Sequence, residues 1–129
     1  MRAVIIALAV LSLGANFTDE QAIRAIAGEA RGEPFAGQIA VGEAIRNRGT
    51  LRGVYGAAVP RKLVSAREWL TAKSAWRVSA TSTLTGGAIG WGNEKDWRKF
   101  VRCAWFKNTV KTVTISGHTF YRMKTKQEA

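Results

Sequence analysis

Residues 28–38 read GEARGEPFAGQ and mark the corner between the first two helices that the sequence predicts. Upstream, Thr18 stands three residues before Gln21, which is the spacing of a capping box at a helix start. Apolar residues then recur at the i, i+3, i+4 and i+7 spacing of one helix face. Because Pro34 prevents this helix from running straight on, Glu29 is expected in its last turn, beside the apolar face.

Outward from this corner, the pattern predicts further helices over residues 37–48, 62–80 and 96–107. Near the end of the chain the period changes to the alternation of strands, and residues 110–121 are expected to form a small hairpin. The sequence therefore predicts a mainly α domain with a small β-hairpin.

The length of 129 residues suits one domain. Arg2 precedes a short apolar run that ends in small residues, which is the layout of an export signal. Three interpretations of this apolar segment, residues 1–15, stay open: a cleavable or weakly anchoring signal, an uncleaved anchor, or the first core helix of a phage-type enzyme. Residues 16–129 are expected to form the domain that carries any active site.

The formal net charge is +11 and the sequence pI is about 10.7. Such a charge favours an anionic partner: nucleic acid, an anionic membrane or the bacterial wall. The basic residues are spread along the chain, whereas nucleic-acid binding is typically indicated by clustered Lys and Arg with aromatic neighbours. We therefore expect weak contact with an anionic surface and no specific nucleic acid.

The sequence does not contain the residues or motifs that several common kinds of catalytic site require. With one histidine and one cysteine, an ordinary zinc site cannot form, and Cys103 among apolar neighbours is expected to be a small buried residue. The sequence contains no His-Glu-x-x-His, no Gly-x-Ser-x-Gly and no phosphate-binding loop. No metal or cofactor is expected, and carboxylate chemistry remains.

Glu29 is the leading candidate for that chemistry. The negative end of the helix dipole disfavours an ionised carboxylate, and a glycosidase acid must be protonated. Spacing alone favours the other interpretation, a solvated helix-end carboxylate paired with Arg31 or Arg24.

Residues 25–48, AIAGEARGEPFAGQIAVGEAIRNR, resemble the opening of the SleB-like cell wall hydrolases, a family that includes spore cortex-lytic enzymes and phage endolysins. Residues 85–93 are similar to the family's Gly-Ala-aromatic-Asn segment, and residues 117–121 are similar to its closing strand. The resemblance extends over about residues 20–122, nearly all of the domain.

This resemblance implies a lysozyme-like α+β single domain, catalytic over residues 16–129, that cleaves the glycan strands of peptidoglycan. Most members act as lytic transglycosylases and leave 1,6-anhydromuramic ends. The family's catalytic glutamate falls on Glu29. Residues 57–62 and 89–91 depart from the family pattern, so the contacts with the sugars are not carried over there.

Five further residues are expected around the substrate. Trp91 is expected to stack on a sugar face, Asn93 to bind an acetamido group and Tyr121 to offer a hydroxyl. The other two have indirect roles. Glu33 is expected to orient Arg31 or shape the cleft, and Gln38 is expected to hydrogen-bond buried backbone beside the cleft. The full set is Glu33, Gln38, Trp91, Asn93 and Tyr121.

Other functions stay open at this point. A hydrolase of the same bond needs a second carboxylate, for which Glu43, Glu94 and Asp96 are candidates. A basic module that binds nucleic acid or wall without catalysis is a further alternative. For the enzyme we expect a monomer that acts in the periplasm or the extracellular wall space. It would reach the wall through an export signal or phage lysis, and a phage-encoded form would stay in the host cytoplasm before release.

Overall fold

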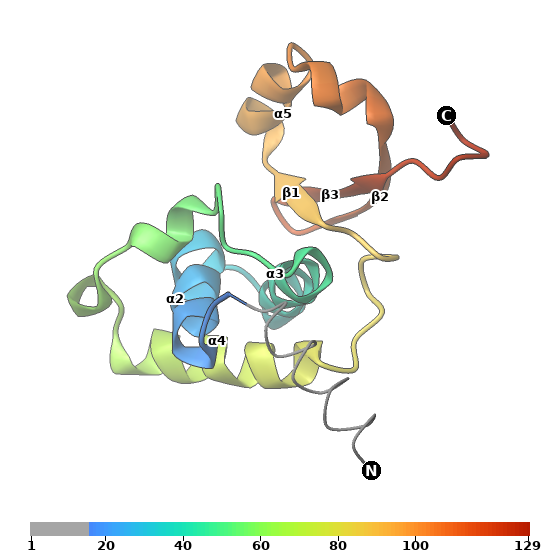
Figure 1. Cartoon of the computed structure of the whole chain (residues 1–129). Coiled ribbons are helices and arrows are strands. Elements are labelled where there is room, and N and C mark those ends of the chain that lie inside the picture. Colours follow the sequence, from blue (N-terminus) through green and yellow to red (C-terminus); the bar gives the residue numbers. More distant parts are fainter. Residues whose placement is uncertain (1–15) are drawn as a thin grey trace.

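The structure is a computed structural model, and it describes residues 16–129 (Figure 1). The interpretations of residues 1–15 as signal, anchor or first helix lie outside the described residues. Figure 1 shows α2 (Asp19–Ala30), α3 (Phe35–Arg48) and α4 (Ala66–Ser79) grouped together, with the sheet and α5 (Glu94–Phe100) on the other side of α3. Within residues 16–129, no helix combines the length and the apolar character that crossing a membrane requires.

Helices α2 (Asp19–Ala30) and α3 (Phe35–Arg48) form the predicted corner. The capping box predicted for α2 is confirmed, because Thr18 and Gln21 exchange hydrogen bonds between side chain and backbone. Helix α3 begins two residues earlier than predicted, directly after Pro34. It ends at Gly49, whose φ of 70° places it in the left-handed region that favours glycine.

The predicted helix over residues 62–80 is divided in two. After the 3₁₀ turn η1 (Tyr55–Ala58), a second one, η2 (Arg61–Leu63), precedes α4 (Ala66–Ser79). Ser65 separates the last two, because its side chain caps α4 by accepting a hydrogen bond from the Glu68 N–H.

The sheet has three antiparallel strands in the order β1-β3-β2. Strands β2 (Thr109–Ile115) and β3 (His118–Met123) form the predicted hairpin. Strand β1 (Gly90–Gly92) was not predicted, since its three residues include two glycines and carry no alternation. Between β1 and β2, the expected helix over residues 96–107 is α5 (Glu94–Phe100) followed by η3 (Ala104–Asn108).

The core lies where α2, α3 and α4 meet, and α3 also contacts β1 and β2. Small side chains let the helices approach closely, and Phe120, with 0% of its surface exposed, extends the core to the sheet. The interpretation of Cys103 as a buried residue is wrong. Because α5 ends at Phe100, Cys103 falls in the turn before η3 and is exposed.

One core position carries a carboxylate. Glu43, in α3, is 4% exposed and accepts hydrogen bonds from the Ser82 hydroxyl, the Thr85 hydroxyl and two backbone N–H groups. The donors lie in the connection from α4 to β1. Glu43 therefore fixes this connection to α3.

Replacing Glu43 with Gln is expected to lower the free energy of unfolding by about 2 kcal/mol, because the amide NH₂ that replaces one carboxylate oxygen then faces a backbone N–H, which can only donate. Denaturant titration measures this difference. Glu94→Gln is the matched control, since Glu94 forms only an exposed pair with Arg98, and its change is expected to stay within about 0.5 kcal/mol. Equal losses in both variants would contradict the role of Glu43.

The effect of pH on Glu43 has a defined sign. Burial raises the pKa of Glu43, but the hydrogen bonds from Ser82, Thr85 and Leu84 outweigh it and hold the pKa below its ordinary value of 4.5. Such a carboxylate stabilises the fold above its ordinary pKa and loses this contribution as pH falls through the folded-state pKa. The difference between wild type and Glu43→Gln is expected to shrink as the pH falls below the ordinary value of 4.5 and through the lower folded-state pKa. A difference that grows on acidification would contradict this account.

Candidate active site

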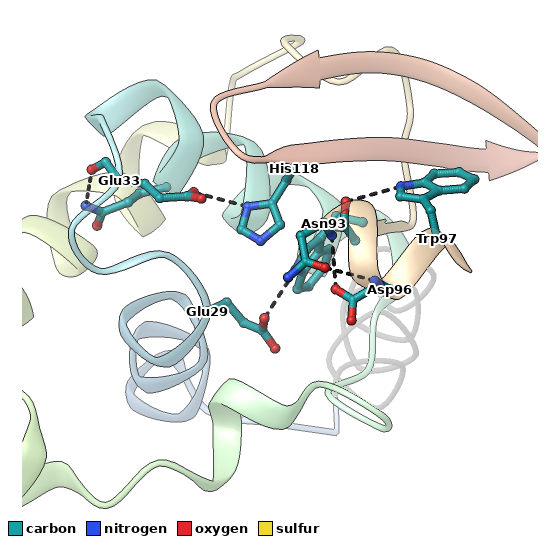
Figure 2. A network of polar contacts seen from close by, with 9 residues as sticks. Glu29, Glu33, Asn93, Asp96, Trp97 and His118 are labelled. Carbon is teal, nitrogen blue, oxygen red and sulfur yellow. Dashed lines mark hydrogen bonds and ion pairs between the residues drawn. The ribbon is translucent and has the colours of Figure 1, made fainter. Parts of the chain in front are cut away.

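Glu29 lies in the last turn of α2, as predicted, and its side chain is half-buried. The Gly56 N–H donates to Glu29 Oε1 at 2.9 Å, and the Trp91 indole N–H lies 3.5 Å from Oε2. These partners come from η1 and β1. In Figure 2 the Glu29 side chain points away from α2 toward the segment that carries Asn93 and Asp96.

The contact between α2 and η1 requires two glycines. A Cβ on Gly28 would lie 2.2 Å from the Gly56 carbonyl oxygen, and a Cβ on Gly56 would lie 2.6 Å from Glu29 Cγ. Side chains larger than hydrogen do not fit between these backbones. The two glycines therefore allow a backbone N–H to reach the Glu29 carboxylate.

The Glu29 side chain lines a cleft of about 380 Å³ between the helices and the sheet side of the molecule. The wall combines aromatic rings with three charged side chains. It is formed by Glu29, Arg48, Gly53, Val54, Tyr55, Trp91, Asp96, Phe100, Trp105 and Tyr121. A polar group among flat apolar surfaces is the arrangement that sugar rings need, since their faces are apolar and their rims polar.

The aromatic side of the cleft is packed tightly. The rings of Trp105 and Tyr121 have centroids 5.5 Å apart, and Phe100 contacts both. The Tyr121 ring lies against Gly90, where a Cβ would be 2.2 Å from the phenol oxygen. Burial raises the pKa of the Tyr121 phenol, and the nearby Arg48 charge partly offsets this, so Tyr121 remains a neutral hydroxyl at neutral pH.

The structure brings Glu29, Trp91 and Tyr121 together in the cleft. Asn93 is exposed and is not among the residues that line it. Its side-chain oxygen caps α5 by accepting from the Asp96 N–H, and the Asp96 carboxylate accepts from the Asn93 N–H (Figure 2). Asn93 therefore serves the start of α5, while Asp96 faces the cleft.

Glu33 and Gln38 belong to a second polar group, away from the residues that line the cleft. Glu33 Oε2 lies 3.1 Å from His118 Nδ1, and the Gln38 amide donates to the Glu33 carbonyl (Figure 2). Arg31, the partner expected for Glu33, donates instead to the Leu63 carbonyl. The Glu33–His118 pair therefore joins the α2–α3 corner to the start of β3.

Removing this link with Glu33→Ala is expected to destabilise the fold by about 1–2 kcal/mol, because His118 is buried and loses its partner. Glu33→Gln retains an oxygen that can accept from His118 and is expected to lose less than half as much. Thermal unfolding of both variants checks this order. If Glu33→Gln is as unstable as Glu33→Ala, the hydrogen bond is not what matters at this position.

Sequence reasoning missed six residues that line the cleft: Arg48, Gly53, Val54, Tyr55, Phe100 and Trp105. Tyr55 is 88% exposed and Trp105 is 38% exposed, so both rings are accessible to a ligand. Their signal is weak in the sequence, because Tyr55 lies in a loop and Trp105 falls within the helix expected over residues 96–107. Only the fold places them beside Glu29.

Within residues 16–129, no group of three or more His, Cys, Asp or Glu side chains is placed to hold a metal ion. The chemistry that the described side chains of the cleft offer is that of Glu29, Asp96, one guanidinium and aromatic rings.

Two solved structures share this fold. The catalytic domain of Bacillus cereus SleB matches with a TM-score of 0.56 and 27% identity, over 81% of this chain and 89% of that domain. The catalytic domain of SleB from Bacillus anthracis, described as a germination-specific lytic transglycosylase, matches with a TM-score of 0.53 and 26% identity, over 83% of this chain and 98% of that domain. No protein-family model matches the chain, and comparison with curated proteins gives no match. The chain therefore has a SleB-like fold: an α+β catalytic-domain architecture of four described helices and a small three-stranded antiparallel sheet.

Proposed function

We propose that this protein cleaves the glycan strands of peptidoglycan and that Glu29 is its catalytic acid. The observation that carries the proposal is a half-buried glutamate, held by a backbone N–H, at the side of an aromatic cleft. The structural similarity to the Bacillus anthracis lytic transglycosylase supports it, because the matched region includes nearly all of that domain.

The proposed reaction begins when protonated Glu29 gives its proton to the glycosidic oxygen as the bond from that oxygen to C1 of muramic acid breaks. The sugar passes through an oxocarbenium-like state. The C6 hydroxyl of the same sugar then bonds to C1, and the Glu29 carboxylate takes the hydroxyl proton. The products are a 1,6-anhydro sugar and a free hydroxyl on the leaving sugar, and no water is consumed.

The neighbours of Glu29 suit both halves of this cycle. The Gly56 N–H donates to one carboxylate oxygen at 2.9 Å and so holds the side chain in place. The Trp91 indole N–H lies by the other oxygen, and its ring lines the cleft. Glu29 therefore keeps one orientation while it acts first as acid and then as base.

Hydrolysis of the same bond is the second candidate, and Asp96 is the observation that favours it. Of the three carboxylates considered as partners for Glu29, Glu43 is buried against the α4–β1 connection and Glu94 pairs with Arg98 on the surface. Asp96 alone of these lines the cleft. A carboxylate there can activate water for attack on C1.

Mass spectrometry of the ends of glycan fragments, released from purified peptidoglycan by the wild type, tests the proposal. A transglycosylase leaves ends that are lighter by one water and resist borohydride reduction. Reducing ends that disappear in Asp96→Asn would favour hydrolysis with Asp96 as the base. Release of peptides without new glycan ends would contradict both versions.

We also propose that the basic surface holds the protein on the anionic wall polymer as a monomer, and that it acts in the periplasm or the extracellular wall space. One form of this proposal is that the protein is a phage endolysin. The net charge of +11 supports contact with anionic polymers.

A further inference from the structure

Among the described residues that line the cleft, Arg48 is the only one with a positive charge. It is the last residue of α3. One guanidinium nitrogen, Nη2, donates to the Arg52 carbonyl at 2.7 Å, whereas Nε is buried without a hydrogen-bond partner. Arg48 forms no ion pair with a carboxylate of residues 16–129. The guanidinium therefore lies at the cleft without a counter-ion.

Arg48 is close to the rings that would contact a sugar. Its Cζ lies 6.0 Å from the centroid of the Trp91 ring. Its charge also acts on the Tyr121 phenol, where it opposes the rise in pKa that burial causes. A group bound against Trp91 and Tyr121 would thus come within reach of the guanidinium.

The two carboxylates of the cleft have other partners. Glu29 accepts from Gly56 and lies beside the Trp91 indole N–H, and Asp96 accepts from the Asn93 backbone. Guanidinium groups bind carboxylates with charge-assisted hydrogen bonds, which are about twice as strong as neutral ones. A cleft cation that the protein itself does not neutralise is suited to an anionic group of the ligand.

We propose that Arg48 binds a carboxylate of the substrate, so that the cleft selects amino-sugar strands with acidic substituents over neutral ones. This inference rests on the proposed function, because it assigns the ligand of the same cleft. Peptidoglycan offers such a carboxylate from two sources. One is the lactyl group of muramic acid where the stem peptide is absent, and the other is the stem peptide itself.

Binding is measured on the Glu29→Gln protein, so that the strands stay intact. The probes are glycan strands with their stem peptides, strands stripped by an amidase, and each of these after its carboxylates have been converted to amides. Amidation is expected to raise the Kd about tenfold or more where Arg48 is present. In Glu29→Gln/Arg48→Gln, this preference for native strands is expected to fall to the small part that general attraction to the basic surface causes. The strand form that loses affinity on amidation identifies the source of the carboxylate.

The matched control is Glu29→Gln/Arg52→Gln, which removes one charge next to the cleft from a side chain that does not line it. This control variant is expected to keep the tenfold preference for native strands. General attraction between the basic surface and a polyanion would instead fall equally in both double variants. Equal Kd values for native and amidated strands with Arg48 in place would overturn the inference. A tenfold preference for native strands that survives Arg48→Gln would also overturn the inference.

A measurement without any variant keeps the inference testable if Arg48→Gln does not fold. Quenching of tryptophan fluorescence in the wild type is expected to show N-acetylmuramic acid binding about tenfold more tightly than N-acetylglucosamine, which lacks the carboxylate. Equal binding of the two sugars would contradict the role of Arg48. Failure of the proposed function has a different signature, since the wild type would then release no glycan fragments whatever Arg48 binds.

Discussion

Gly28→Ala is expected to lower the free energy of unfolding by more than about 3 kcal/mol and to abolish most of the activity, because the new methyl group meets backbone atoms that cannot rotate away. Its Cβ would lie 2.2 Å from the Gly56 carbonyl oxygen and 2.5 Å from Gly56 Cα. Turn η1 must then move off α2, and the Gly56 N–H moves away from Glu29 with it. Denaturant titration and wall digestion measure the two losses.

Whether Gly28→Ala lowers or raises the free energy of unfolding distinguishes the effect of packing against η1 from the effect of helix propensity. In an exposed helix position, Gly→Ala stabilises by about 1 kcal/mol, so a destabilisation of Gly28→Ala comes from the contact with η1. Ser74→Ala, on an exposed position of α4, is the control and is expected to stay within about 0.5 kcal/mol. Unchanged or increased stability of Gly28→Ala would show that η1 does not need this close approach.

Local signals predicted α2, α3 and the hairpin. The capping box of Thr18 and Gln21 and the stop at Pro34 both act within a few residues of the chain, so they are readable without the fold. They also place Glu29 in the last helical turn. Another local signal was present at the start of α5, where Asn93 and Asp96 have the spacing of a capping box, and it explains Asn93 better than a sugar contact does.

The features that were not predicted depend on distant pairing. Strand β1 exists because Trp91 is paired with Phe120 of β3, and nothing in the three residues Gly90–Gly92 indicates a strand by itself. In the same way, Gly56 is an ordinary loop glycine until α2 is placed against it. The sequence could name the candidate carboxylate, Glu29, but not the backbone N–H that holds it.

Charged residues show the same limit. Glu43 and Asp96 were equivalent candidates for a second carboxylate, and only the fold separates the buried anchor from the residue in the cleft. Likewise, Glu33 stands beside Arg31 in sequence but pairs with His118, 85 residues away. Tertiary contacts decide between neighbours that are equally close in the pattern.

Glu29→Gln removes the carboxyl that is proposed to break the glycosidic bond, and it is expected to abolish cleavage. Glutamine keeps an oxygen that can accept from the Gly56 N–H, so thermal stability is expected to stay close to that of the wild type. It has no proton of suitable acidity to give, so the rate is expected to fall about a thousandfold or more. Glu20→Gln, an exposed change in the first turn of the same helix, is the control for the lost charge and should retain full activity.

The measurement is the amount of new glycan ends that each protein releases from the same purified peptidoglycan, counted by mass spectrometry. New glycan ends are expected from the wild type and from Glu20→Gln, and none above background from a folded Glu29→Gln protein. The same ends, released by Glu29→Gln at the rate of the wild type, would contradict the assignment of Glu29 as the catalytic acid.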